Sequence, residues 1–262
     1  MIYVNEIDPF CAKWIQNLMD ADVLPRGHID TRSIEDVTPN DLAGYTQHHF
    51  FAGLGGWIYA LDLAGWPRDR AVWTGSCPCQ PFSQAGEGAG FEDERHLWPA
   101  FQHLIAQCRP SVVLGEQVAS KDADAWIDLV HADMEGMGYA FGCVPFAAAG
   151  VGAPQARERT SWVADTYGTG LQGHGQSGWK HGAQRWADAA RHPAASGVVE
   201  WVTDREGFTR PIESGTRPLA HGISGRVGRL CAYGNAIVPQ QQAEFIRAYV
   251  EARGLIEVAE AA

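Results

Sequence analysis

Short apolar segments alternate with segments of helical periodicity along residues 1–165, and this alternation constrains the fold more than any other feature. The segments 1–4, 47–51 and 111–114 have the length of buried strands, whereas 97–108 carries apolar residues at helical spacing. Parallel strands need a crossover connection, which is usually a helix. We therefore predict an α/β fold with a doubly wound, mainly parallel sheet.

The first predicted strand ends at an acidic residue. Glu6 follows the run 1–4, and Asp8-Pro9 then opens a helix, with aspartate as the N-cap and proline in the first turn. The apolar residues at helical spacing in this segment are Phe10, Trp14 and Leu18. Because open parallel sheets bind ligands at the carboxyl ends of strands, Glu6 is a candidate acceptor for ribose hydroxyls. Asp30, near a second predicted strand, is a candidate acceptor for an adenine amino group.

A glycine-rich turn separates the predicted strand 47–51 from a helix over 57–64. Glycine lets the backbone approach a ligand closely, but strand–helix turns without ligands also carry glycine. Further along, Cys79 stands between Pro78 and Pro81 at the end of another apolar run. The prolines restrict the backbone, so we expect a thiol held at the mouth of a strand, as a nucleophile requires.

Several segments resemble motifs of the DNA cytosine-5 methyltransferases. Pro78-Cys-Gln-Pro-Phe-Ser83 is similar to the catalytic motif, and Phe51-Ala-Gly-Leu-Gly-Gly56 is similar to the S-adenosylmethionine loop. The other similar segments are Asn5–Asp8, Glu116–Val118, Gln155–Arg159 and Gly234–Pro239. The resemblance covers roughly residues 1–165 and 226–250. It implies a Rossmann-like methyltransferase fold, S-adenosylmethionine as the cofactor, and DNA, with a cytosine flipped out of the duplex, as the substrate.

The resemblance also implies roles for individual residues. The catalytic group comprises Cys79, Glu116, Arg157 and Arg159. The cofactor-binding group comprises Glu6, Asp30, Phe51, Ala52, Gly53, Gly55, Gly56 and Asn235. The substrate-binding group comprises Gln80, Ser83 and Gln155. In the implied reaction the Cys79 thiolate adds to carbon 6 of cytosine, and Glu116 donates a proton to ring nitrogen 3 if apolar surroundings raise its pKa.

Two departures from the family pattern stand out. Glu6 and Asp30 precede the glycine loop, whereas in the family the loop comes first, so the order of the strands is locally permuted. Gln117 follows Glu116 where the family usually has asparagine. We expect the active site to survive the permutation, because it depends on which strand ends are adjacent and not on how loops join them.

Residues 166–225 break the regular pattern and form a predicted irregular insert, which divides the chain into 1–165, 166–225 and 226–262. Residues 166–230 contain eight Lys or Arg and five acidic residues, a balance of +3 in a chain whose net charge is −11. A locally basic segment is compatible with a polyanion that contacts one face only. We therefore expect the insert to be the short target-recognition region.

The six cysteines are scattered without facing pairs, which argues against disulfides and structural zinc, so we expect no metal. Neither an export signal nor a membrane-spanning segment is recognisable, so we expect a cytoplasmic monomer in a bacterial or phage setting, with a cognate restriction enzyme as one candidate partner. Two alternatives stay open. These are an RNA cytosine-5 methyltransferase, which the acidic net charge favours, and a catalytically silent homologue that binds nucleic acid.

Overall fold

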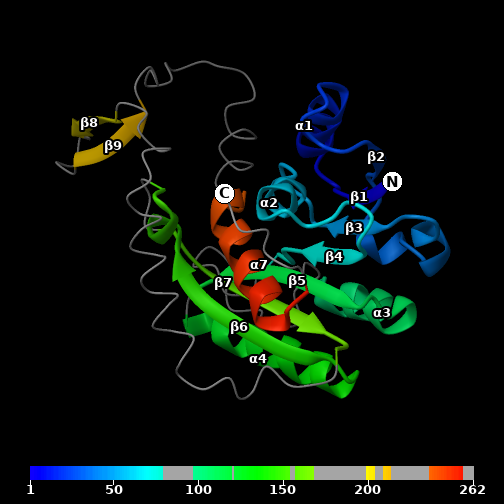
Figure 1. The fold of residues 1–262 in the computed structure, drawn as a ribbon. Coiled ribbons are helices and arrows are strands. Elements are labelled where there is room, and N and C mark those ends of the chain that lie inside the picture. The colour runs from blue at the N-terminus through cyan, green and yellow to red at the C-terminus, as the bar shows by residue number, and fades with distance from the viewer. Residues whose placement is uncertain are drawn as a thin grey trace, which may run out of the picture.

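A seven-stranded sheet in the order β2-β1-β3-β4-β5-β7-β6 forms the centre of the molecule (Figure 1). The computed structural model describes residues 1–78, 97–119, 121–153, 157–167, 199–203, 209–213 and 236–255. The strands are β1 (Ile2–Asn5), β2 (Gly27–Asp30), β3 (Gln47–Phe50), β4 (Val72–Gly75), β5 (Val112–Val118), β6 (Ala140–Ala147) and β7 (Glu158–Asp165). All neighbours from β2 to β5 are parallel, and β7 is antiparallel to both β5 and β6. The prediction of a mainly parallel α/β sheet is confirmed.

Helices cover both faces of this sheet, as the doubly wound prediction requires (Figure 1). On one face lie α1 (Pro9–Asp20), α2 (Gly56–Ala64) and α7 (Pro239–Arg253); on the other lie α3 (Trp98–Cys108) and α4 (Lys121–Gly136). Successive residues of a strand point to opposite faces. Val4 accordingly packs in a cluster with Ile15 of α1, whereas Tyr3 shares the opposite cluster with Phe101 of α3. Short 3-10 helices are η1 (Ile34–Asp36), η2 (Pro39–Leu42) and η4 (Ala148–Val151).

The beginning of α1 is as predicted, but its buried face differs. Asp8 is the N-cap, and its Oδ1 accepts a hydrogen bond from the Cys11 amide at 2.8 Å. The residues that face the core are Cys11, Ala12, Ile15 and Met19. Phe10 and Trp14 instead stack on each other at the flank of the helix. The two series have the same four-residue spacing one position apart, so periodicity alone cannot choose between them.

The strands are permuted along the chain, but they lie in the usual order within the sheet. If the glycine-loop strand β3 is counted first, the acidic strand β1 second and β2 third, the sheet reads 3-2-1-4-5. This is the usual order of a doubly wound sheet, with the ligand crevice beside the first strand. The N-terminal segment therefore occupies the position that a conventional order would give it, and the predicted permutation is confirmed.

Two parts of the fold were not foreseen in detail. The segment of β6 contains Gly142 and Pro145 and shows no clear alternation, so no strand was predicted there. Within the predicted insert, β8 (Val199–Thr203) and β9 (Thr209–Glu213) form a separate two-stranded antiparallel sheet. The segment 226–230, where regular structure was expected to resume, lies outside the described residues, and the three-part division of the chain stays a prediction. In the described part of the chain, none of the helices combines the length and apolarity needed to span a bilayer.

Candidate active site

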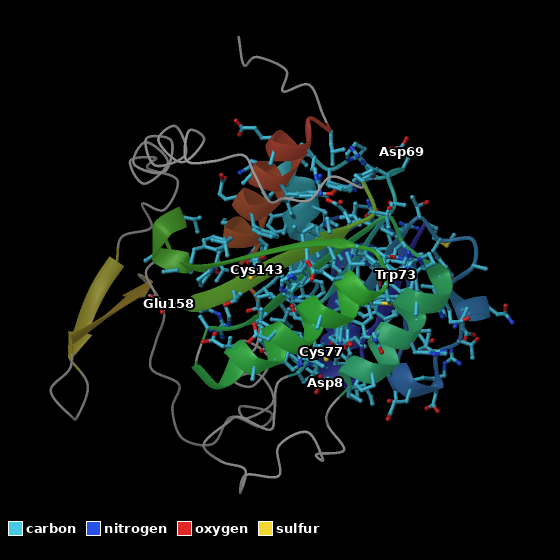
Figure 2. The ribbon with its side chains drawn as sticks, turned by 90° about the horizontal axis from the view of Figure 1, so that it is seen from below. Asp8, Asp69, Trp73, Cys77, Cys143 and Glu158 are labelled. Atoms are coloured by element: carbon cyan, nitrogen blue, oxygen red, sulfur yellow. The ribbon has the colours of Figure 1, made fainter. Side chains whose placement is uncertain are left out.

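A cavity of about 490 Å³ lies where the parallel strands of the central sheet end. Its wall includes Glu6 after β1, Gly53 after β3, Ser76 after β4 and Glu116 of β5. Figure 2 shows Asp8 and Cys77, two further lining residues, at this same end of the sheet. Parallel strands carry their carboxyl ends to one edge, so four segments far apart in sequence meet here. The cavity thus lies where ligands of open α/β sheets bind.

Glu6 joins the acidic strand to the glycine loop. Its Oε2 accepts a hydrogen bond from the Gly53 amide at 2.6 Å, and its Oε1 accepts one from the Asp8 amide at 2.8 Å. Burial raises the pKa of Glu6 above its usual 4.5, while these two amides favour the charged form. A carboxylate oxygen can accept a second hydrogen bond. Glu6 can therefore still bind a pair of hydroxyl groups of a ligand in the cavity.

The glycines of the loop have different surroundings. Gly53 has a φ of +54°, and a Cβ there would meet no atom within 4 Å. Gly55 has a φ of +82° and is the N-cap of α2, but a Cβ there would lie 2.9 Å from Leu24 in the core. Phe51, Ala52, Gly53 and Gly56 line the cavity, whereas Gly55 does not. Gly55 therefore shapes the turn without forming part of the cavity wall.

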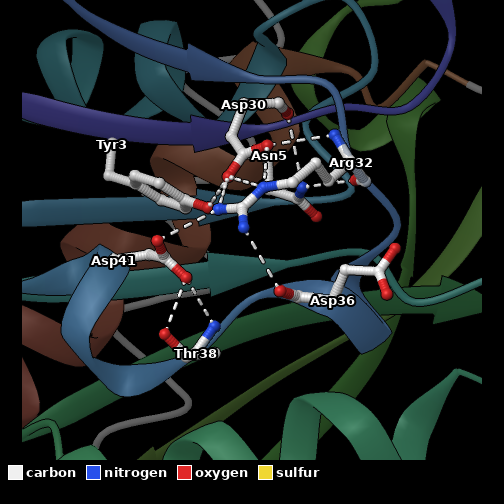
Figure 3. Close-up of polar contacts among 7 residues, drawn as sticks. All are labelled: Tyr3, Asn5, Asp30, Arg32, Asp36, Thr38 and Asp41. Carbon is white, nitrogen blue, oxygen red and sulfur yellow. Dashed lines mark hydrogen bonds and ion pairs between the residues drawn. The ribbon is translucent and has the colours of Figure 1, made fainter.

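Asp30 occupies a different place from the one its predicted role needs. Its carboxylate accepts hydrogen bonds from the Arg32 guanidinium at 2.6 Å and from the Tyr3 hydroxyl at 2.8 Å (Figure 3). Asp30 does not line the cavity. Arg32 also pairs with Asp41, which ties η2 to the same cluster. The Arg32 hydrogen bond is the main reason that the pKa of Asp30 falls from 3.8 to about 2. In this structure Asp30 holds the loop after β2, whose residues Ser33 and Ile34 reach the cavity instead.

Glu116 and Arg159 form an ion pair in the cavity wall. The Nε of Arg159 lies 2.7 Å from Oε1 of Glu116, and the carboxylate side chain is only 8% exposed. Burial raises the pKa of Glu116 above its usual 4.5, although Arg159, Arg157 and a hydrogen bond from Ser76 act in the opposite direction. A carboxyl group that retains its proton to higher pH is suited to general acid catalysis.

Arg157 connects the site to the C-terminal segment. Its Nη2 donates a hydrogen bond to the carbonyl of Ala236 at 2.7 Å, and Ala236 and Ile237 line the cavity whereas Arg157 does not. Buried amides continue this attachment along α7. Gln241 donates to the Phe146 carbonyl, and Gln242 accepts from the Ser161 hydroxyl. These contacts hold the segment before α7, whose residues Ala236 and Ile237 form part of the cavity wall.

The nucleophile predicted from sequence, Cys79, lies outside the described residues, as do Gln80, Ser83, Gln155 and Asn235. Pro78, the residue before Cys79, lines the cavity. The described thiol of Cys11 also lines it, but burial and the neighbouring Glu6 and Asp8 raise its pKa to about 12. Cys11 is therefore protonated at neutral pH and unsuited to nucleophilic attack.

Sequence reasoning missed several residues of the wall. Ile7, which is 63% exposed, and Ile34 both line the cavity, so its wall includes two apolar side chains. Ser76 and Trp57 supply a hydroxyl and an indole. Position along the chain could have indicated them, because Ile7 and Ser76 lie within two residues of the ends of β1 and β4, and Trp57 directly follows the glycine loop. The glycine loop, a hydroxyl-accepting acid and apolar side chains together fit a nucleoside-containing cofactor such as S-adenosylmethionine.

The fold is a Rossmann-like, mainly parallel α/β sheet, and the candidate site lies at the carboxyl ends of its parallel strands. The sequence profile described as C-5 cytosine-specific DNA methylase matches residues 65–181 of this chain. Similar proteins include Type II methyltransferase M.HhaI of Haemophilus parahaemolyticus, 27% identical over 47% of this chain and 50% of the relative. Type II methyltransferase M.NlaX of Neisseria lactamica is 31% identical over 44% of this chain and 38% of its own length.

Solved structures similar to this chain include the crystal structure of a Spodoptera frugiperda DNMT2 E260A/E261A/K263A mutant. It is 15% identical with a TM-score of 0.43, and the likeness covers 68% of this chain and 46% of that chain. The chain spans half or less of the length of the relatives named here.

Proposed function

We propose that this protein transfers a methyl group from S-adenosylmethionine to carbon 5 of cytosine in DNA. The observation that carries the proposal is the buried Glu116–Arg159 pair in one cavity with Glu6 and the glycine loop. An acid held beside an arginine suits a heteroaromatic ring that gains a proton, and the glycine loop suits a nucleotide-like cofactor. The match of residues 65–181 to the C-5 cytosine-specific DNA methylase profile supports the same assignment.

The residues of the chain have distinct tasks in this reaction. The Cys79 thiolate forms a bond to carbon 6, and the charge that this addition pushes to ring nitrogen 3 is neutralised by the proton of Glu116. Arg159 holds the exocyclic oxygen of the base. When bound, S-adenosylmethionine supplies the methyl group that carbon 5 accepts. A base then takes the proton from carbon 5, the proton on ring nitrogen 3 returns to Glu116, and departure of the Cys79 thiolate restores the aromatic ring.

Glu6 and the Gly53 backbone would hold the ribose end of the cofactor, with Ile7 and Ile34 against the adenine ring. Because the reacting carbon of cytosine is stacked within a duplex, the base must be flipped into the cavity. The insert, residues 166–225, belongs to the net-positive segment 166–230 and is the proposed DNA-binding face. Neutralising Arg185, Arg205 and Arg210 together should weaken binding to every sequence and reduce its salt dependence.

Mass analysis of nucleosides from cells that express the chain tests the function. We expect 5-methylcytosine in DNA with the wild type and none above background with Cys79→Ala. Cys143→Ala is the matched control, since Cys143 is an exposed free cysteine on β6. Methylation found only in RNA would replace the DNA assignment with the RNA alternative. Absence of methylation in both, with S-adenosylmethionine and DNA still bound, would favour a silent homologue.

A further inference from the structure

Trp57 lies in the first turn of α2, directly after the glycine loop, and is almost fully buried. Its indole Nε1 donates a hydrogen bond to the Ser76 hydroxyl at 3.0 Å. The indole is a donor only, so the Ser76 oxygen must be the acceptor. Both residues line the cavity, Trp57 from the first turn of α2 and Ser76 from the position after β4. The glycine loop is thereby tied to the segment that leads to Cys79.

Gly75 of β4 and Gly115 of β5 are register partners, so the residues that follow them, Ser76 and Glu116, are neighbours at the end of the sheet, and hydrogen bonding by Ser76 acts to lower the pKa of Glu116. Because its oxygen accepts from Trp57, the hydroxyl proton of Ser76 is available for the carboxylate. Arg159 supplies a second donor to the same group at 2.7 Å. A carboxylate that accepts hydrogen bonds from groups on two separate segments, Ser76 after β4 and Arg159 on β7, is restricted in its rotation. Trp57, Ser76 and Glu116 thus form a continuous chain from the cofactor loop to the proposed general acid.

We propose that Trp57 and Ser76 are positioning residues, which orient the Glu116 carboxyl for proton transfer to the base and couple that orientation to the glycine loop. The inference rests on the proposed function, because it gives Trp57 and Ser76 a part in the reaction assigned to Glu116. It concerns residues of this chain that neither the sequence motifs nor the family resemblance single out.

The direction of the expected effects follows from the groups around Glu116. Burial raises its pKa, and Arg159, Arg157 and the Ser76 hydroxyl lower it. Removing the Ser76 hydroxyl should therefore raise the pKa of Glu116 further. The acid form of Glu116 would then persist to higher pH, so the alkaline fall in the methylation rate should move to higher pH. Removing only the Trp57 donor should cause a smaller shift in the same direction, because Ser76 remains.

Three variants test the chain of contacts. Ser76→Ala removes the hydroxyl, and Trp57→Phe removes the indole donor while keeping an aromatic ring. Trp66→Phe is the matched control, because Trp66 is equally buried but donates to the Arg70 carbonyl and does not line the cavity. For each protein we would measure single-turnover methylation against pH and S-adenosylmethionine affinity by calorimetry. The carbon-13 NMR signal of labelled glutamate, assigned with Glu116→Gln, reports the ionisation of Glu116 without cofactor.

We expect Ser76→Ala and Trp57→Phe to lose about 10- to 100-fold in the methylation rate through misplacement of the acid. The Glu116 titration and the alkaline limb should move to higher pH, and Trp66→Phe should behave as wild type. If the wild type methylates but both variants match Trp66→Phe in rate and titration, the inference fails and the proposed function stands. If the wild type does not methylate, the proposed function fails and the inference with it.

Discussion

Arg157 and Arg159 stand two positions apart in sequence and take different tasks. Arg159 faces the cavity and pairs with Glu116, whereas Arg157 holds the carbonyl of Ala236. We expect Arg157→Met to weaken S-adenosylmethionine binding by about tenfold, because a buried hydrogen bond from a charged group is lost and the wall at Ala236 loosens. Arg159→Met should mainly lower the methylation rate. Calorimetry and single-turnover kinetics separate the two; a loss of rate without loss of affinity in Arg157→Met would contradict its assignment.

The pH dependence of methylation should report Glu116. Burial raises its pKa above 4.5, and the protonated form is the proton donor. The rate should therefore fall as pH rises through the pKa of Glu116. We expect Glu116→Gln to lower the rate by about 10²- to 10⁴-fold and to abolish this alkaline limb, while the cofactor still binds. Rates measured across a pH series check both effects, and an unchanged limb would assign it to another group.

His49 of β3 should make the folded protein sensitive to acid. Burial lowers its pKa from 6.5 to about 3, so between these values the unfolded chain binds more protons than the folded one. The free energy of unfolding then falls as pH falls, by up to about 2 kcal/mol between pH 6.5 and pH 5. His49→Gln, which cannot titrate, should lose less stability over this range. Urea unfolding at the two pH values measures the difference, and an equal loss in both proteins would contradict it.

At the scale of elements, α7 is held by a buried ion pair at its last turn. Arg253 makes a bidentate contact with Asp165 at the end of β7, and the Tyr249 hydroxyl donates to the same carboxylate. Asp165 is fully buried. This anchor fixes the C-terminal end of the helix, while the buried amides Gln241 and Gln242 fix its beginning. Both attachments lie on β6 and β7, the two strands that run antiparallel to their neighbours.

Replacing one member of the Asp165–Arg253 pair should lower the free energy of unfolding more, per residue replaced, than replacing both members together. Asp165→Asn or Arg253→Met alone should lower the free energy of unfolding by about 3–5 kcal/mol, because each leaves a buried charge without its partner. The double variant should lose less than the sum of the two. Urea unfolding of all four proteins measures the coupling. Strict additivity would mean that the two residues act independently.

For the whole molecule, the permuted order should be reversible. The first residues of β1, β3 and β4 are in register across the sheet, at Ile2, Gln47 and Val72. The starts of β1 and β4 are therefore about two strand spacings apart, or roughly 10 Å, which a linker of about four residues spans. Residues 1–46 could therefore be moved to the exposed turn between Arg68 and Asp69. Figure 2 shows Asp69 on the far side of the molecule from Asp8 and Cys77 of the cavity.

The rearranged chain should fold and bind S-adenosylmethionine as the natural order does, because the strand neighbours are unchanged. Circular dichroism, thermal unfolding and calorimetry check this. Placing the same segment at Gly138, before the edge strand β6, is the control and should prevent folding, because β1 could not reach β3. Equal behaviour of the two rearranged chains would contradict the topological argument.

The sequence by itself determined the features that depend on local pattern and residue chemistry. The strand–helix alternation, the Asp8 cap and the helix after the glycine-rich turn all follow from residues a few positions apart. The family motifs identified Glu116, Arg159, Glu6 and the glycine loop as one set of residues, and the structure brings them to one cavity.

Only the tertiary structure decided the contacts that join distant segments. It placed Asp30 against Arg32 and Tyr3, Arg157 against Ala236, and Trp57 against Ser76. Residues that are 79 positions apart, as Arg157 and Ala236 are, share no local pattern from which a hydrogen bond could be predicted. Their meeting depends on how the strands are ordered and how α7 returns to the sheet. Hydrogen bonding and burial in three dimensions, and not residue type alone, divide these polar side chains between the cavity and the scaffold that supports it.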